Sequence, residues 1–194
     1  MRPGRATRRS GSIGDFDAVL AGARANAPEA WNALYGWLAP GVAGYLRMLG
    51  ARDVEDVTSE VLLAVFRRIG SFEGTEANFR SWVFTVAHSR VIDERRRRTR
   101  RPDTEPFAPH DNDHVASDDP AGAALEALEV AHVERVCAEL PADQRAVVLL
   151  RIIGELSIEQ VAEILGKSQG AVKQLQRRAF ETIRQSFARE GVTP

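Results

Sequence analysis

The sequence predicts an all-α protein with two small helical domains joined by a flexible acidic linker. Apolar residues recur at the three- and four-residue spacing of helices, and no segment alternates with the two-residue period of a strand. Residues 103–119 contain six acidic residues and no lysine or arginine. That segment also has several prolines and few large apolar side chains, so it cannot form a core. A chain of 194 residues is long enough for a small domain on each side of it.

Eight helices are expected, four on each side of the linker. They cover residues 15–26, 28–49, 53–69, 77–97, 121–138, 141–153, 157–165 and 168–187. Pro28 and Pro141 fit first helical positions, where the missing N–H has no partner to lose. Pro40 lies inside the second segment and is expected to kink or split it. The expected organisation is a disordered basic tail at 1–14, a domain at 15–102, the linker at 103–120, a domain at 121–187 and a tail at 188–194.

Composition argues against several classes of protein. No apolar run approaches about 20 residues, so no membrane span is expected. The N-terminal arginines are not followed by an apolar segment, so a secretory signal is not expected. Cys137 is the only cysteine, which excludes an internal disulfide and suits a reducing cytoplasm. It lies in an apolar helical pattern, so we expect a buried structural thiol in a cytoplasmic protein.

The net charge of −1 hides a strong separation of charge along the chain. Residues 90–101 hold seven arginines against two acidic residues, and residues 166–190 hold six basic residues against two glutamates. The acidic linker separates these blocks, and each is a candidate phosphate-binding surface. His110 and His114 lie in the linker at a spacing that would suit a metal only on a helix, so no metal or cofactor is expected.

The segment that begins at Ser157 has the pattern of a helix-turn-helix. Ser157 and Gln160 form a capping-box pair before an apolar helical face. Gly166 can take the positive φ of a tight turn. Ala162 is small enough for the point where two helices cross, and Val172, ten residues later, is expected to fill the gap between them.

The second helix of this motif follows Ser168, which can cap it, and carries hydrogen-bond donors on its outer faces. Such donors are suited to phosphates and to base edges in the major groove. The candidate DNA-binding residues are Ser168, Gln169, Gly170, Lys173, Gln174, Arg177 and Arg178. The alternative is that the motif is plain helix packing with an ordinary solvated basic face.

Acidic and aromatic residues precede the first basic block. The acids stand at the start of a helix, where the helix dipole favours them. They are Asp53, Glu55, Asp56 and Glu60. An unusually aromatic segment at 72–86 then leads into the arginines, and aromatic faces beside cations suit single-stranded nucleic acid. The alternative is that most of these aromatics fill the core, which fits the i, i+3 and i+7 spacing of Phe79, Trp82 and Val86.

In combination, these residues resemble the extracytoplasmic-function (ECF) sigma factors of bacterial RNA polymerase, the smallest relatives of sigma-70. The resemblance covers about residues 15–102, as a sigma-2 domain, and 121–187, as a sigma-4 domain. The four acids match the helix that binds the polymerase clamp. The −10 segment is matched by Phe72, Phe79, Trp82, Ala87, Asp93 and the arginines that follow. The −35 module is matched by Leu140, Pro141, Arg145, Ala162, Gly166, Gly170, Val172, Lys173, Arg178 and Ala179.

The resemblance implies an alternative sigma factor that directs promoter-specific initiation and has no enzymatic activity. The sigma-2 domain would dock on the clamp of the largest subunit of core RNA polymerase and capture the −10 element as a flipped-out single strand. The sigma-4 domain would contact the flap of the second-largest subunit and bind the −35 duplex. The implied polymerase contacts are Asp53, Glu55, Asp56, Ser59 and Glu60. The implied −10 contacts are Trp82, Phe84, Ser89, Arg90, Arg95, Arg96, Arg97 and Arg98. An anti-sigma factor is the further partner that the family implies.

Three positions depart from the family pattern. Ser59 replaces the usual glutamine, Ser89 stands where many relatives have asparagine, and Leu175 and Gln176 replace a common Arg–Leu pair. The promoter sequence and the base contacts at these positions therefore stay open.

Two other classes remain open from the residues alone. One is a helix-turn-helix repressor or activator with an N-terminal sensor domain, and the other is an RNA-binding or nuclease-like helical protein. No constellation of histidine, cysteine or paired carboxylates supports catalysis. Co-purification with core polymerase would separate the classes, because a repressor binds duplex DNA without it.

Overall fold

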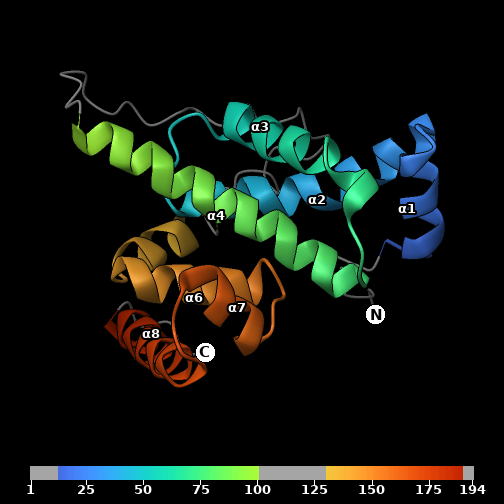
Figure 1. The fold of residues 1–194 in the computed structure, drawn as a ribbon. Helices are drawn as coiled ribbons and strands as arrows, with labels where there is room; N and C mark the ends of the chain where they lie inside the picture. Colours follow the sequence, from blue (N-terminus) through green and yellow to red (C-terminus); the bar gives the residue numbers. More distant parts are fainter. Residues whose placement is uncertain (1–12, 101–129, 190–194) are drawn as a thin grey trace, which may run out of the picture.

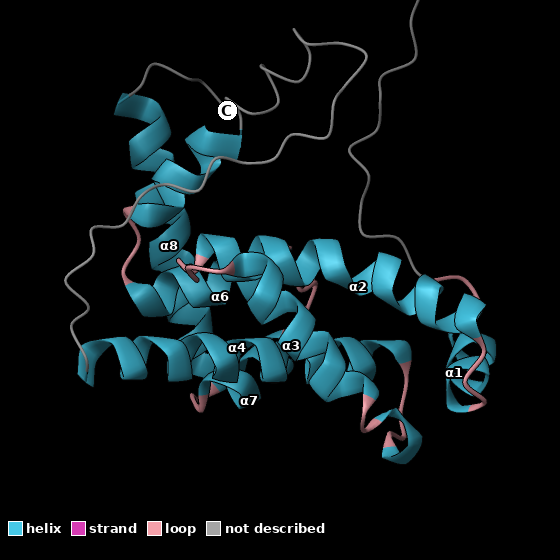
Figure 2. Cartoon of the chain, turned by 90° about the horizontal axis from the view of Figure 1, so that it is seen from above, coloured by secondary structure: helices cyan, strands magenta, loops and turns pink. Residues whose placement is uncertain are grey.

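The computed structural model describes residues 13–100 and 130–189, which form two helical units (Figure 1). The first unit, residues 13–100, contains α1 (Phe16–Arg24), α2 (Pro28–Met48), α3 (Val54–Phe66), the 3-10 turn η1 (Ile69–Ser71) and α4 (Glu76–Arg100). The second unit contains a helical stretch at 130–138, then α6 (Ala142–Ile152), α7 (Ile158–Leu165) and α8 (Gln169–Arg189). The described residues contain no strand (Figure 2), so the prediction of an all-α fold with two helical domains is confirmed. The predicted linker at 103–120 lies outside the described residues, as do most of the predicted tails.

The core of the first unit lies where α2, α3 and α4 pack together. An aromatic cluster joins α1 and η1 to this core: the Phe79 ring lies 5.5 Å from Phe16, 4.9 Å from Phe72 and 5.7 Å from Trp82. Phe79 itself is fully buried. Burial of a side chain of this size stabilises the fold by about 1.5–3 kcal/mol. Phe79 therefore belongs to the core, as the packing alternative predicted.

The second unit is built around α6, which contacts both α7 and α8. Leu150 of α6 and Val172 of α8 are fully buried. Arg145 Nη2 donates a hydrogen bond of 2.7 Å to the carbonyl of Ala138, which lies at the end of the 130–138 stretch. Cys137 in that stretch is buried and free, so the predicted structural thiol is confirmed.

Two proline predictions need correction, whereas Pro28 begins α2 as predicted. Pro40 does not split α2, which is continuous from residue 28 to 48. Pro40 and Gly36, whose carbonyl loses its helical donor, are both exposed, so water can satisfy that carbonyl. The opposite face of the helix is held in the core by Leu38 and Val42. Pro141 is the N-cap of α6 and not its first helical residue, a difference of one position.

The end of the third helix also differs from the prediction, which extended it to residue 69. The α-helix ends at Phe66 and a 3-10 turn follows at Ile69–Ser71. Ile69 is buried within this turn, so the same apolar residue is accommodated by a tighter backbone. Arg24 of α1 donates to the carbonyls of Ile69 and Phe72, which fixes the turn against the first helix.

The two units pack directly against each other. α4 contacts α7, and α2 contacts α6. Figure 1 shows the second unit lying along one side of α4, away from α3. The described residues therefore form one docked arrangement of the two units.

Candidate nucleic-acid interface

Capping fixes the helix-turn-helix formed by α7 and α8. Ser157 Oγ accepts from the backbone N–H of Gln160 at 3.1 Å, and Gln160 Oε1 accepts from the N–H of Ser157 at 2.9 Å. The predicted capping box is thereby confirmed. α7 ends at Leu165 and is capped by Gly166, whose φ of 61° favours glycine. Ser168 Oγ accepts from the N–H of Ala171 at 3.2 Å and caps α8 as predicted.

Packing and an ion pair hold α8 in a defined orientation on the second unit. Val172 is fully buried, and Ala162 is 6% exposed, which places both at the predicted helix crossing. In the turn between α7 and α8, Lys167 Nζ lies 2.8 Å from Asp143 Oδ2 of α6. The orientation of α8 thus depends on two buried apolar residues and on a solvent-exposed ion pair, none of which belongs to the predicted −35 contacts.

Every residue that the sequence predicts for −35 contact is exposed. These residues are Ser168, Gln169, Gly170, Lys173, Gln174, Arg177 and Arg178. Arg177 Nε lies 3.9 Å from Glu181 Oε1, but both side chains are more than half exposed, so this pair is weak and screened by salt. Leu175 and Gln176, which depart from the family pattern, are half-buried. The outer face of α8 is therefore a row of donors that can contact a partner without rearrangement of the unit.

A second exposed row lies at the start of α3 and carries the predicted polymerase contacts. These are Asp53, Glu55, Asp56, Ser59 and Glu60, and all are exposed. Asp53 caps the helix, since its Oδ1 accepts from the N–H of Asp56 at 3.0 Å. Glu60 Oε2 lies 3.8 Å from Arg90 Nη1 of α4. This pair connects a predicted polymerase contact with a predicted −10 contact.

The two aromatic residues predicted for the −10 element occupy different environments. Trp82 is half-buried and stacks on Phe72 with ring centroids 5.5 Å apart and planes 8° apart. Phe84 is only 3% exposed and meets the Tyr45 ring edge-on at 5.4 Å. Trp82 alone of the two presents surface to solvent, and Phe84 lies in the interior.

The polar residues predicted for the −10 element also divide. Ser89, Arg96 and Arg97 are exposed, and Arg90 is half-buried. Arg95 Nη2 donates to the carbonyl of Leu49 at the C-terminal end of α2. A helix end leaves carbonyls without intrahelical donors, so this contact stabilises the end of α2. Arg98 lies in α4, but its side chain lies outside the described part of the chain.

No sequence pattern indicated the pair formed by the buried Tyr45 and the half-buried His88. The Tyr45 hydroxyl and His88 Nδ1 are 2.8 Å apart. Burial, and then the charge of Arg95, lowers the pKa of His88, while Asp143 of the second unit opposes this shift. Burial also raises the pKa of Tyr45. Both groups are therefore neutral near pH 7, with the phenol positioned to donate to the imidazole.

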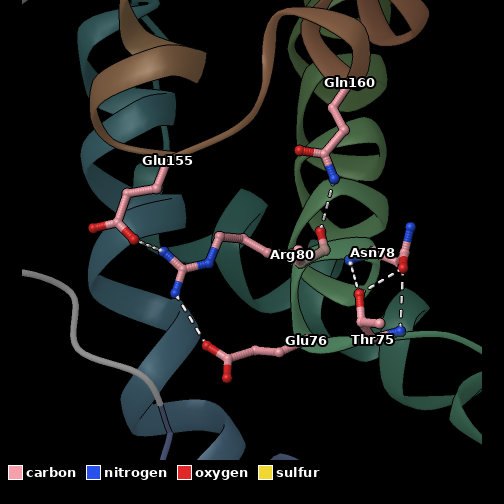
Figure 3. A network of polar contacts seen from close by, with 7 residues as sticks. Thr75, Glu76, Asn78, Arg80, Glu155 and Gln160 are labelled. Atoms are coloured by element: carbon pink, nitrogen blue, oxygen red, sulfur yellow. Dashed lines mark hydrogen bonds and ion pairs between the residues drawn. The ribbon is translucent and has the colours of Figure 1, made fainter.

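Arg80, which was not among the predicted site residues, lies at the centre of the polar network in Figure 3. Its guanidinium lies 5.0 Å from the centre of the Trp37 ring, Nη2 lies 3.6 Å from Glu76 Oε1, and Nη1 lies 2.5 Å from Glu155 Oε2. Arg80 is 8% exposed. Its position as a lone arginine among apolar and aromatic residues was the signal that could have indicated a buried, paired cation.

The described residues contain no group of three or more His, Cys, Asp or Glu side chains that could hold a metal ion. Within the same residues, no helix combines the length and apolar character needed to cross a bilayer.

Comparison with family models matches both units. The model described as Sigma-70 region 2 matches residues 34–101, and the model described as Sigma-70, region 4 matches residues 137–185. The first covers the core of the first unit and α4, and the second covers α6, α7 and most of α8.

The chain is similar to several characterised proteins. It is 32% identical over 163 residues to the ECF RNA polymerase sigma factor BldN of Streptomyces coelicolor, covering 83% of this chain and 61% of BldN. It is 30% identical over 179 residues to the ECF sigma factor RpoE of Cereibacter sphaeroides, covering 90% and 96% of the two chains. It is 32% identical over 178 residues to the ECF sigma factor SigL of Mycobacterium tuberculosis, covering 91% of this chain and 99% of SigL.

Two solved structures share the fold. CnrH in complex with the cytosolic domain of CnrY gives a TM-score of 0.61 at 20% identity, covering 88% of this chain and 96% of that one. RpoE in complex with the anti-sigma factor NepR, from Bartonella quintana, gives a TM-score of 0.60 at 21% identity, covering 79% of this chain and 94% of that one. Together with the matches of sequence over both units, these findings show that the chain belongs to the ECF RNA polymerase sigma factors of the sigma-70 family.

Proposed function

We propose that this chain directs transcription initiation by binding core RNA polymerase and by recognising the −35 element as duplex and the −10 element as a single strand. The observation that supports this most strongly is the outer face of α8, where every predicted donor is exposed on a helix held by capping and burial. A rigid row of donors is what recognition in the major groove requires. The partners are core polymerase and promoter DNA, and the site of action is the cytoplasm.

The −35 element would be bound along the first half of α8. Amide and guanidinium groups of Gln169, Gln174 and Arg178 suit base edges, and Lys173 and Arg177 suit phosphates. The N-terminus of α8 also favours a phosphate, because its first N–H groups point outward. Gly170 has no side chain there, so the DNA backbone can approach closely.

The −10 element would be bound along α4 as a separated strand. Trp82 offers a half-buried aromatic ring for stacking, and Ser89, Arg90, Arg96 and Arg97 offer hydrogen bonds and charge. Extraction of a base costs a few kcal/mol, and base–aromatic stacking returns about 1–3 kcal/mol for each base. Phe84 and Arg95 act in this proposal by positioning α4, given their contacts with Tyr45 and Leu49. No covalent bond changes at any step, so the mechanism is binding and not enzymatic catalysis.

The acids of α3 would dock on the clamp of the largest polymerase subunit, and the second unit on the flap of the second-largest. Asp53, Glu55, Asp56, Ser59 and Glu60 are exposed on a helix whose opposite face is buried. RpoE of Bartonella quintana is bound by the anti-sigma factor NepR. We extend that relationship to this chain, with an anti-sigma factor as a further partner.

Reconstitution with core polymerase tests the proposal. Run-off transcription across genomic fragments is expected to yield promoter-specific transcripts only when the chain is added. The double variant Asp56→Arg and Glu60→Arg is expected to lose polymerase binding and transcripts while its circular dichroism is unchanged, because exposed acids near a helix start contribute only about 0.3–1 kcal/mol each.

Glu163→Arg, a charge reversal at an exposed position on α7, serves as the control and should retain activity. Normal polymerase affinity in the folded double variant would contradict the clamp assignment. Sequence-specific duplex binding without any polymerase-dependent transcript would instead support a repressor.

A further inference from the structure

The irregular segment between α3 and α4 leads to the helix proposed to bind the −10 strand, and hydrogen bonds hold it at both ends. At its start, the N–H of Phe72 donates to the carbonyl of Ile69 at 3.2 Å and closes η1. At its end, Thr75 Oγ1 accepts from the N–H of Asn78 at 3.3 Å, and Asn78 Oδ1 accepts from the N–H of Thr75 at 3.1 Å (Figure 3). This reciprocal pair caps the start of α4.

Arg24, the last residue of α1, contacts the start of this segment from outside it. Its Nε donates to the carbonyl of Ile69 at 3.4 Å, and its Nη2 donates to the carbonyl of Phe72. Phe72 follows η1 in extended backbone, with φ of −75° and ψ of 132°, so its carbonyl takes no part in a helical ladder. A guanidinium presents its donors in a rigid planar fork. Contact through two of its nitrogens therefore defines where both carbonyls lie.

The side chain of Phe72 carries this position to Trp82, a predicted −10 contact. The two rings, called here the aromatic stack, have planes 8° apart and centroids 5.5 Å apart. Phe79 meets Phe72 at 82° and Trp82 at 74° between ring planes, so it supports both rings edge-on. Gly74 leaves room for the stack, since a Cβ built there would lie 3.3 Å from Phe72 Cζ. The place of the indole thus depends on Phe72, and the place of Phe72 depends on Arg24.

A fixed indole matters for a surface that binds single-stranded DNA. Trp82 is half-buried, whereas Phe84, the other aromatic residue predicted for the −10 element, lies in the interior. Bases stack on aromatic rings with little dependence on their sequence. A side chain that becomes ordered only on binding loses affinity to that ordering, so a ring that is held beforehand binds more tightly.

The alternative explanation of Arg24 is a direct contact with a DNA phosphate, because the residue is exposed. Two of its three side-chain nitrogens already donate to backbone carbonyls of the protein, which favours positioning. Arg24 and all of α1 also precede residue 34, where the match to Sigma-70 region 2 begins. The role of Arg24 therefore does not follow from that match and has to be argued from its contacts.

We propose that Arg24 is a positioning residue that holds the aromatic stack in place, so that the Trp82 indole is ready for a base of the separated −10 strand. The role in −10 binding rests on the proposed function, whereas the positioning of the stack is independent of it. Arg24 acts through Phe72 and does not touch the DNA.

Two variants at Arg24 and one matched control test the proposal. Arg24→Gln removes the charge and the guanidinium and keeps a good helix former. Arg24→Lys keeps the charge but has one nitrogen where the arginine donates through two. Arg47→Gln is the control, because Arg47 is likewise an exposed arginine in the last turn of a helix. The change of charge and the loss of interaction with the helix dipole are therefore the same in both glutamine variants.

Fluorine NMR of the full chain labelled with fluorotryptophan reports the position of the stack. The chain has three tryptophans, and Trp82→Phe identifies the resonance of Trp82. Arg24→Gln and Arg24→Lys should shift or broaden this resonance, and Arg47→Gln should leave it as in the parent. An unchanged Trp82 resonance in both Arg24 variants would overturn the positioning.

DNA binding by the holoenzyme with core polymerase tests the role of the stack. The probes come from a promoter found by run-off transcription: its −35 duplex, and a labelled single-stranded oligonucleotide that carries its −10 sequence. Both Arg24 variants should bind the single strand about fivefold more weakly, because stacking is impaired, and the −35 duplex as the parent does. The salt dependence of single-strand binding should stay that of the parent, because no phosphate contact is lost.

Other outcomes would contradict the proposal in distinguishable ways. A phosphate contact would lower the salt slope by about 0.7 in Arg24→Gln and leave full affinity in Arg24→Lys, which would overturn positioning. Equal losses for both probes would overturn a local role. A shifted Trp82 resonance with unchanged single-strand affinity would overturn the role in −10 binding. If the parent supported no initiation, the proposed function would fail, and the fluorine resonance alone would still decide whether Arg24 positions the stack.

Discussion

The two helices proposed to bind DNA, α8 and α4, hold their basic residues in different ways. Lys173, Arg177 and Arg178 extend from α8 into solvent, while other parts of the second unit fix the helix. On α4, Arg80 and Arg95 contact groups of the protein itself. Basic residues on a helix therefore form an available surface along α8, whereas on α4 two of them, Arg80 and Arg95, make structural contacts.

The largest expected contrast is in stability, because α4 depends on the aromatic core for its position. Phe79→Ala should lower the free energy of unfolding by about 3–5 kcal/mol, since it removes a fully buried ring with four aromatic neighbours. Val172→Ala, at the equivalent buried contact of α8, should cost about 2 kcal/mol because it removes only two methyl groups. Urea denaturation followed by circular dichroism measures both. Equal losses would show that α4 is no more dependent on its core than α8.

A smaller contrast separates binding from stability at two arginines. Arg177→Ala should weaken binding to −35 duplex, and the slope of the logarithm of the binding constant against the logarithm of the salt concentration should become smaller by about one. Its stability should change by less than about 0.5 kcal/mol. Arg95→Ala should lower stability by about 1–2 kcal/mol, because the Leu49 carbonyl loses a charged donor. Thermal unfolding and a salt titration of duplex binding, performed on both variants, report the two effects. A stable Arg95→Ala protein with weakened DNA binding would show that Arg95 is a DNA contact after all.

The sequence predicted features that depend on local chemistry. The Ser157–Gln160 box, the turn at Gly166 and the buried Val172 all follow from side chains within about ten residues of one another, and the structure confirms each. Their spacing alone determines the hydrogen bonds and the buried face. The exposed face of α8 was predictable for the same reason.

Features that depend on distant residues were not predictable. Phe84 was expected at the DNA surface, but Tyr45 of α2 and the Ile153 turn cover it. The partner of Arg80 lies 75 residues away at Glu155, and no local pattern indicates that pair or its strained backbone. Pro40 was expected to kink or split α2; the helix is not split, because burial on the opposite face maintains it.

The smallest contrast concerns pH and again lies on α4. Burial lowers the pKa of His88 below its ordinary 6.5, so the unfolded chain binds this proton more readily than the folded protein. Stability from the neutral Tyr45–His88 pair is therefore present above about pH 6.5 and is lost as the pH falls below it. Between pH 7.5 and 5.5, the parent should therefore lose more stability than His88→Gln does in urea denaturation. If the difference in stability between the parent and His88→Gln did not change with pH, the imidazole would not be held neutral by the fold. The charged groups that act on this imidazole are Arg95 and Asp143.

The environment of Cys137 determines how reactive its thiol is in the folded protein. It is the only cysteine in the sequence, it is buried, and burial raises the pKa of its thiol despite the opposing charge of Arg145. Oxidants and alkylating agents react with the thiolate, which this environment disfavours. The Cys137 thiol is therefore expected to resist oxidation to sulfenic acid while the protein is folded.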